Sequence, residues 1–84
     1  ISLRVAEQPH GPITSSGLLF THEGRSIGYS TDFHELNDQM AALFAGIDLW
    51  IVDALRARPH PSHSHLHQTL GYIDRLSPKR AILT

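Results

Sequence analysis

Leu49 to Val52 form a continuous apolar run that stands between two aspartates, Asp48 and Asp53. A strand made only of apolar residues has no polar face to turn toward water, so it is typical of a sheet that is covered on both sides. The run therefore predicts a central strand, buried on both faces, in a layered α/β domain.

Four further segments have the pattern of strands. Ile1 to Glu7 alternates apolar and polar residues, which is the two-residue period of a half-buried strand. Gly17 to Thr21 and Ile27 to Ser30 predict two short strands joined by a hairpin turn at Glu23-Gly24-Arg25. Arg80 to Thr84 predicts a final strand.

The segment from Glu35 to Ala45 has the apolar spacing of an amphipathic helix, with Leu36, Met40, Leu43 and Phe44 on one stripe. Thr31 or Asp32 could cap its start, and Gly46 is placed to end it.

A second helix is expected after Ser64, which can cap it, and Pro78 prevents its continuation. Its predicted apolar stripe consists of Leu66, Leu70, Ile73 and Leu76. The expected order is β-β-β-α-β-α-β, an α/β (α+β) arrangement in which a hairpin layer runs into strand–helix alternation.

Composition limits the classes of protein to consider. Eighty-four residues allow one domain, and 40% apolar with 18% charged residues argues against disorder. A formal charge of −1 gives no long-range attraction to nucleic acid or to anionic lipid. Without cysteine there is neither a disulfide framework nor a thiolate metal site, and no apolar run is long enough to span a bilayer. We expect a cytoplasmic protein.

His10 and Asp32 are the first candidates for metal ligands. Pro9, Gly11 and Pro12 predict a stiff, irregular loop that carries His10 at a strand end, where binding residues concentrate. Asp32 follows a predicted strand, so its carboxylate could either cap the next helix or bridge two divalent ions. Imidazole and carboxylate ligands without thiolate suit zinc or manganese.

The stretch from His60 to His67 contains four histidines. If the chain is helical from Leu66 onward, His65 and His67 point outward in the first turn. His63, in the preceding loop, is the most free to face a cleft, where an imidazole could act as a general acid near neutral pH.

Three strings of residues carry a resemblance to a known family. They are Tyr29-Ser30-Thr31-Asp32, then Asp53-Ala54-Leu55-Arg56 running on to Pro59-His60-Pro61-Ser62-His63, and Pro78-Lys79-Arg80-Ala81-Ile82-Leu83-Thr84. In order and spacing they resemble the phosphoribosyl 1,2-cyclic phosphodiesterase-like branch of the metallo-β-lactamase superfamily. The fold implied is an αββα sandwich, of which this chain would supply one βα half.

The resemblance also implies roles for single residues. His10 matches a histidine that binds one metal ion, and Asp32 matches an aspartate that bridges two Zn²⁺ or Mn²⁺ ions. His63 matches a histidine that contacts the substrate phosphate and can act as general acid. Arg56 would contact the substrate, and Asp53 would orient the metal ligands. The implied reaction is attack of a metal-bridging hydroxide on a small phosphodiester of the cyclic nucleotide or ribose-phosphate type.

The family motif His-x-His-x-Asp-His is absent from this sequence. We therefore interpret residues 1–84 as the C-terminal portion of a single metallo-β-lactamase-fold domain, inactive alone and weak in metal binding. The expected partners are the small substrate and the remainder of the same domain. We expect neither membrane binding nor strong nucleic-acid binding, and a homodimer is possible. Such a portion would also expose apolar surface.

Two other interpretations stay open. The same superfamily includes thioesterase-, lactonase- and nuclease-type hydrolases, which use similar metal sites. The third interpretation is a non-enzymatic α/β module whose stretch from His60 to His67 binds metal or a partner protein.

Overall fold

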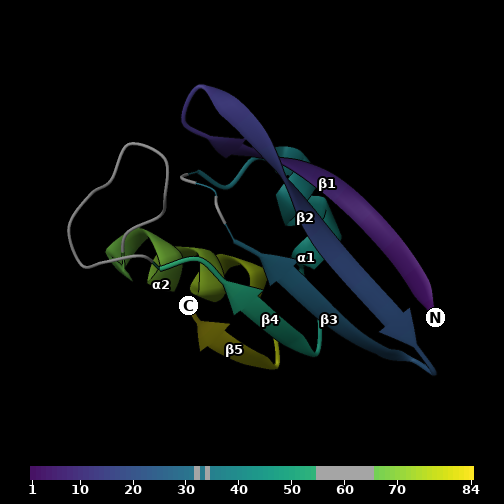
Figure 1. Cartoon of the computed structure of the whole chain (residues 1–84). Coiled ribbons are helices and arrows are strands. Elements are labelled where there is room, and N and C mark those ends of the chain that lie inside the picture. Colours follow the sequence, from purple (N-terminus) through teal and green to yellow (C-terminus); the bar gives the residue numbers. More distant parts are fainter. Residues whose placement is uncertain (32, 34, 55–65) are drawn as a thin grey trace.

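The computed structural model describes residues 1–31, 33, 35–54 and 66–84. Five strands form one mixed sheet in chain order (Figure 1). They are β1 (Ser2–His10), β2 (Ile13–His22), β3 (Arg25–Ser30), β4 (Leu49–Val52) and β5 (Arg80–Leu83). β1, β2 and β3 pair antiparallel, whereas β3, β4 and β5 pair in parallel. The α/β class and the predicted order β-β-β-α-β-α-β are confirmed.

Two helices make the crossovers that parallel strands require. α1 (Asp38–Phe44) joins β3 to β4, and α2 (Leu66–Leu76) lies between β4 and β5 in the chain. Both helices lie on the same side of the sheet (Figure 1), where Trp50 and Val52 of β4 share a buried apolar cluster with Phe44 and Leu76. The rings of Phe44 and Trp50 stack with centroids 5.8 Å apart. The core is this single layer between sheet and helices.

The prediction of an irregular loop around His10 is wrong. β1 continues through Pro9 to His10, which pairs with Ile13, so that only Gly11 and Pro12 form the turn. Gly11 has φ +60°, a conformation that glycine adopts without strain. Proline is tolerated in β1 because this strand lies at the edge of the sheet.

The second hairpin turns at Glu23 and Gly24, as predicted, and both residues have positive φ, 50° and 77°. Two consecutive residues with positive φ are typical of the tight turns that suit twisted strands. The flanking strands are longer than the alternation alone predicted.

α1 begins three residues later than expected. Its cap is Asn37, whose Oδ1 accepts a hydrogen bond from the Met40 N–H at 2.8 Å, so the proposed capping by Thr31 or Asp32 is wrong. The Nδ2 of Asn37 also donates to the Glu7 carbonyl at 3.0 Å, which ties the cap to β1. Gly46 follows the helix with φ +66°, as predicted for its C-terminal end.

The face of α2 that packs on the sheet differs from the predicted stripe. Thr69 and Leu76 are buried, and Tyr72 and Ile73 pack against the core, whereas Leu70 is 49% exposed. The buried positions still follow helical spacing, but the stripe is rotated to include a threonine. Ser64 lies outside the described residues.

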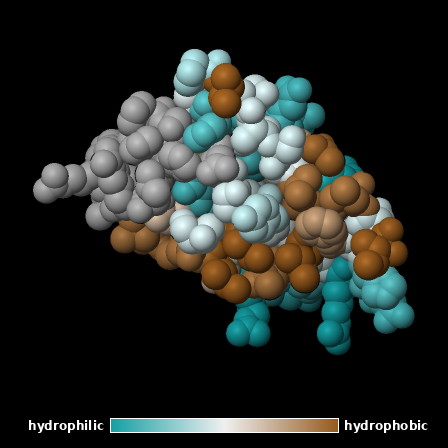
Figure 2. Space-filling view, in the orientation of Figure 1, coloured by the Kyte–Doolittle hydropathy of each residue, from teal (hydrophilic) through white to brown (hydrophobic). Residues whose placement is uncertain are grey.

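The opposite face of the sheet has no covering layer among the described residues. Alternate residues of all five strands point to this side, so the expectation that β4 is buried on both faces is wrong for this chain. The apolar side chains of the uncovered face belong to Leu3, Val5, Leu18, Phe20, Ile27, Tyr29, Leu49, Ile51 and Ile82. Figure 2 shows hydrophobic residues gathered over this face. The exposed apolar surface that the sequence predicts is present here.

Among the described residues, no helix is both long and apolar enough to cross a membrane.

Candidate functional site

The carboxyl ends of four strands point toward one end of the sheet. β1 is antiparallel to β2 and β2 to β3, so β1 runs in the same direction as β3, β4 and β5. His10 ends β1, Thr31 follows β3, and Asp53 follows β4 at this end. Binding sites of open α/β sheets occur at the carboxyl ends of strands, so this end is the candidate site.

Asp53 is buried, with 4% of its surface exposed. Its carboxylate Oδ2 accepts a hydrogen bond from the Phe33 N–H at 3.2 Å, and its own N–H donates to the Ser30 carbonyl at 2.8 Å. The hydroxyl of Thr69 on α2 donates to the Asp53 carbonyl. Asp53 therefore links the ends of β3 and β4 to α2.

Gln8 is fully buried on β1, although its side chain is polar. Its Nε2 donates to the Thr31 carbonyl at 3.0 Å and to the Ser15 hydroxyl at 3.1 Å. The Thr31 carbonyl belongs to the peptide bond that precedes Asp32, and the Phe33 N–H belongs to the peptide bond that follows it. Two buried side chains, Gln8 and Asp53, thus hold the backbone on both sides of position 32.

Asp32, Arg56 and His63 themselves lie outside the described residues, as do the histidines at 60 and 65. Of the predicted site residues, the structure describes His10 and Asp53, both at the carboxyl ends of strands that run in the same direction, with His10 four residues farther along β1 than Ala6, which is level with Ser30. His67 lies in the first turn of α2 and is exposed, as expected.

Sequence reasoning missed Gln8 and Thr69. The sequence carries no signal for Gln8: it shares the strand face of Ala6, which is buried, whereas the alternation of Ile1, Leu3 and Val5 favours the other face. Thr69 does carry a signal, because it lies at helical spacing from Ile73 and Leu76.

The donor chemistry at this end fits a divalent ion in part. Imidazole from His10 and carboxylate from Asp32 are nitrogen and oxygen ligands of the kind that zinc and manganese accept. Within the described ranges, however, no three histidine, cysteine, aspartate or glutamate side chains come together. One oxygen of the Asp53 carboxylate accepts a hydrogen bond from the Phe33 backbone N–H.

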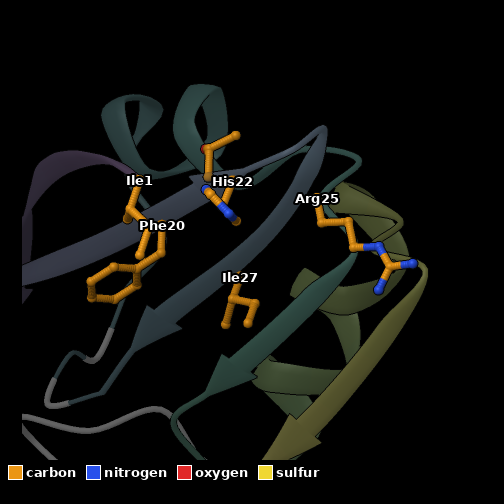
Figure 3. A pocket seen from close by; sticks show the side chains of 6 residues that line it. Ile1, Phe20, His22, Arg25 and Ile27 are labelled. Atoms are coloured by element: carbon orange, nitrogen blue, oxygen red, sulfur yellow. The ribbon is translucent and has the colours of Figure 1, made fainter.

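The opposite end of the sheet carries a shallow hollow of about 390 Å³. Figure 3 shows Ile1, Phe20 and Ile27 beside it, together with His22 and Arg25. Its lining is mostly apolar and belongs to the uncovered face, so it has the character of a packing surface rather than of a catalytic centre.

Solved structures share this fold over nearly the whole chain. A diphosphatase from the PhnP family is 29% identical, with a TM-score of 0.86 over 98% of this chain and 31% of that chain. Human tRNase Z, short form, is 24% identical, with a TM-score of 0.83 over 98% and 34% of the two chains. YhfI from Bacillus subtilis, a metallo-β-lactamase fold protein, is 16% identical, with a TM-score of 0.83 over 98% and 35%.

The chain thus spans about a third of the length of each of these structures. None of the curated proteins matches it in sequence. The family model of the β-lactamase superfamily domain, by contrast, matches residues 1–84. That superfamily consists of metal-dependent hydrolases, and its fold implies divalent metal binding in general. The sheet, its two helices and the family match lead to one conclusion: the chain belongs to the β-lactamase superfamily domain family and forms one half of the metallo-β-lactamase fold.

Proposed function

We propose that this chain is the C-terminal portion of a metal-dependent phosphodiesterase that acts on a small cyclic nucleotide or ribose-phosphate type of phosphodiester in the cytoplasm. The observation that supports the site is the pair of hydrogen bonds made by the buried side chains of Gln8 and Asp53, which hold the backbone on either side of position 32. The similarity to a diphosphatase at 29% identity supports chemistry at phosphorus.

In this proposal His10 and Asp32 would hold divalent ions, zinc or manganese, together with ligands from the N-terminal portion of the domain. Ions bound there supply positive charge that stabilises negative charge developing on a phosphoryl oxygen. Asp53 keeps the backbone after Asp32 in place through the Phe33 N–H. His63 would donate a proton to the leaving oxygen, and Arg56 would pair with the phosphate.

The decisive experiment is the divalent-metal-dependent hydrolysis of bis(p-nitrophenyl) phosphate by the complete protein, meaning this chain together with the N-terminal portion. Asp32→Ala should abolish turnover, whereas Asp38→Ala, at an exposed residue in the first turn of α1, should leave it intact. The 84-residue chain alone should show no turnover and weak metal binding.

Three results would contradict the proposal. A folded, metal-loaded protein without phosphodiesterase activity would favour the carboxylic-ester and thioester branches. A complete protein that binds no divalent ion would exclude the metal-dependent hydrolase itself. Tight, stoichiometric binding of two ions by the isolated chain would contradict the division of ligands between two portions.

A further inference from the structure

Gln8 makes a contact that the packing of the core does not require. Its carboxamide is fully buried and lies over Gly17 of β2, and Nε2 donates to the Thr31 carbonyl and the Ser15 hydroxyl. Because a carbonyl oxygen can only accept a hydrogen bond, the amide nitrogen must be the atom that faces Thr31.

The surroundings are shaped for this carboxamide. A Cβ on Gly17 would lie 2.4 Å from Gln8 Oε1, so glycine at position 17 leaves the space that the side chain fills. Oε1 has no hydrogen-bond partner among the described residues. A buried, unpaired carbonyl oxygen is unfavourable, and a methionine would fill the same space without it. A role limited to packing therefore does not explain glutamine at position 8.

The contact also joins the two strands that carry the proposed metal ligands. Gln8 lies two residues before His10 on β1, and by alternation the two side chains share one face of the strand. Thr31 directly precedes Asp32. β2 separates β1 from β3 in the sheet, so the Gln8 side chain reaches across it to the backbone that leads into Asp32.

We propose that Gln8 is a positioning residue for the metal site: its amide fixes the Thr31–Asp32 peptide relative to the strand that carries His10. This inference rests on the proposed function, in which His10 and Asp32 bind divalent ions. Groups that orient metal ligands through hydrogen bonds typically change metal affinity by about 10- to 100-fold when they are lost.

The test compares Gln8→Met with Ser15→Ala in the complete protein. Gln8→Met removes the bond to the Thr31 carbonyl at similar side-chain volume, whereas Ser15→Ala removes the second partner of Nε2 and leaves Thr31 bonded. Calorimetric titration of the metal-free proteins with Zn²⁺ should show affinity weakened by about tenfold in Gln8→Met. Ser15→Ala should bind Zn²⁺ as the wild type does.

The side-chain amide signals of Gln8 give a second measurement that needs no variant. In selectively labelled wild-type protein, these N–H signals should exchange slowly with solvent and shift as Zn²⁺ is added. This NMR experiment keeps the inference testable even where Gln8→Met does not fold.

The results of these experiments distinguish a failure of the role of Gln8 from a failure of the proposed metal-dependent function. Wild-type protein that binds no Zn²⁺ overturns both. Wild-type protein that binds Zn²⁺, with Gln8→Met as tight as Ser15→Ala, overturns the role of Gln8 alone. Gln8 amide signals that stay unchanged at saturating Zn²⁺ overturn that role as well.

Discussion

Asp48 joins three segments at the amino ends of the parallel strands. Its Oδ2 accepts hydrogen bonds from the Ser26 N–H at 2.8 Å and from the Ser26 hydroxyl at 3.2 Å. Its Oδ1 lies 3.1 Å from the Lys79 ammonium. The hydrogen bond from the Ser26 backbone, followed by that from Lys79, lowers the pKa of the Asp48 carboxyl below its ordinary value of 3.8.

This lowered pKa gives a pH dependence with a definite sign. A carboxyl with a lower pKa in the folded than in the unfolded state stabilises the fold above the unfolded value, and that contribution disappears as the pH falls through the folded value. We expect Asp48→Asn to be less stable than wild type at pH 7, with a difference that shrinks steadily below pH 3.8. Urea unfolding at several pH values between 7 and 2 measures it.

Lys79→Met is the matched variant, because it removes the ammonium and leaves both bonds from Ser26. It should lose part of the pH-dependent stability, but less than Asp48→Asn does. Parallel stability curves for wild type and Asp48→Asn would show that the carboxylate contributes nothing through its charge.

Single residues differ in how far the sequence predicts their roles. The position of Asp53 at a strand end followed from the apolar run before it, since a run of that length has definite ends. The partner of Asp53 did not follow, because the Phe33 N–H meets it only after β3 and β4 pair in parallel. The cap residue Asn37 does not follow from the sequence, because several polar residues precede the helix and local sequence does not distinguish among them.

At the scale of elements, α1 approaches the sheet so closely that β3 needs a glycine. A Cβ on Gly28 would lie 2.6 Å from Ile47 Cδ1 and 2.7 Å from Phe44 Cδ1. Since real Cβ atoms do not approach so closely, Gly28→Ala must displace the side chains of Ile47 and Phe44.

We expect Gly28→Ala to destabilise the fold by roughly 1–3 kcal/mol, the usual cost of overpacking a core. Gly71→Ala on α2 is the control, because its Cβ would meet nothing within 4 Å. It should stabilise the fold by roughly 0.5–1 kcal/mol, since alanine favours a helix more than glycine does. Chemical denaturation of the two variants should therefore give changes of opposite sign. If Gly28→Ala were neutral, the contact between α1 and β3 would be looser than the structure indicates.

The period of apolar residues predicted the type and order of the elements. It was a poorer guide to the face that each element buries. Ile1, Leu3 and Val5 alternate as a half-buried strand does, yet Leu3 is 53% and Val5 55% exposed. The buried side chains of β1 are Ala6 and Gln8, on the other face. The period is a property of the strand, but which face is buried depends on the layers around it. In α2, likewise, Leu70 points away from the sheet and Thr69 toward it.

For the whole molecule, the uncovered face explains why Leu49 to Val52 is apolar throughout, although only Trp50 and Val52 are fully buried among these residues. Ile51 and Ile82 lie side by side across β4 and β5, and Tyr29 continues the same row on β3. Stacked sheets interdigitate such rows at a spacing of about 10 Å. The residues on this face are suited to packing against a second apolar layer. This fits an αββα sandwich of which this chain is one half.

The uncovered face also predicts the solution behaviour of the isolated chain. Burying apolar surface is favourable by roughly 25 cal/mol per Å², so two copies should associate through these faces as the concentration rises. Sedimentation velocity over a range of concentrations should reveal this association, and the double variant Ile27→Lys with Ile82→Lys should suppress it by placing charges on the face. Leu70→Lys is the control: Leu70 is similarly exposed, at 49%, but lies on α2, so that variant should associate as wild type does. A wild-type chain that stays monomeric at high concentration would contradict the prediction, and suppression by Leu70→Lys alone would assign the association to the helical side.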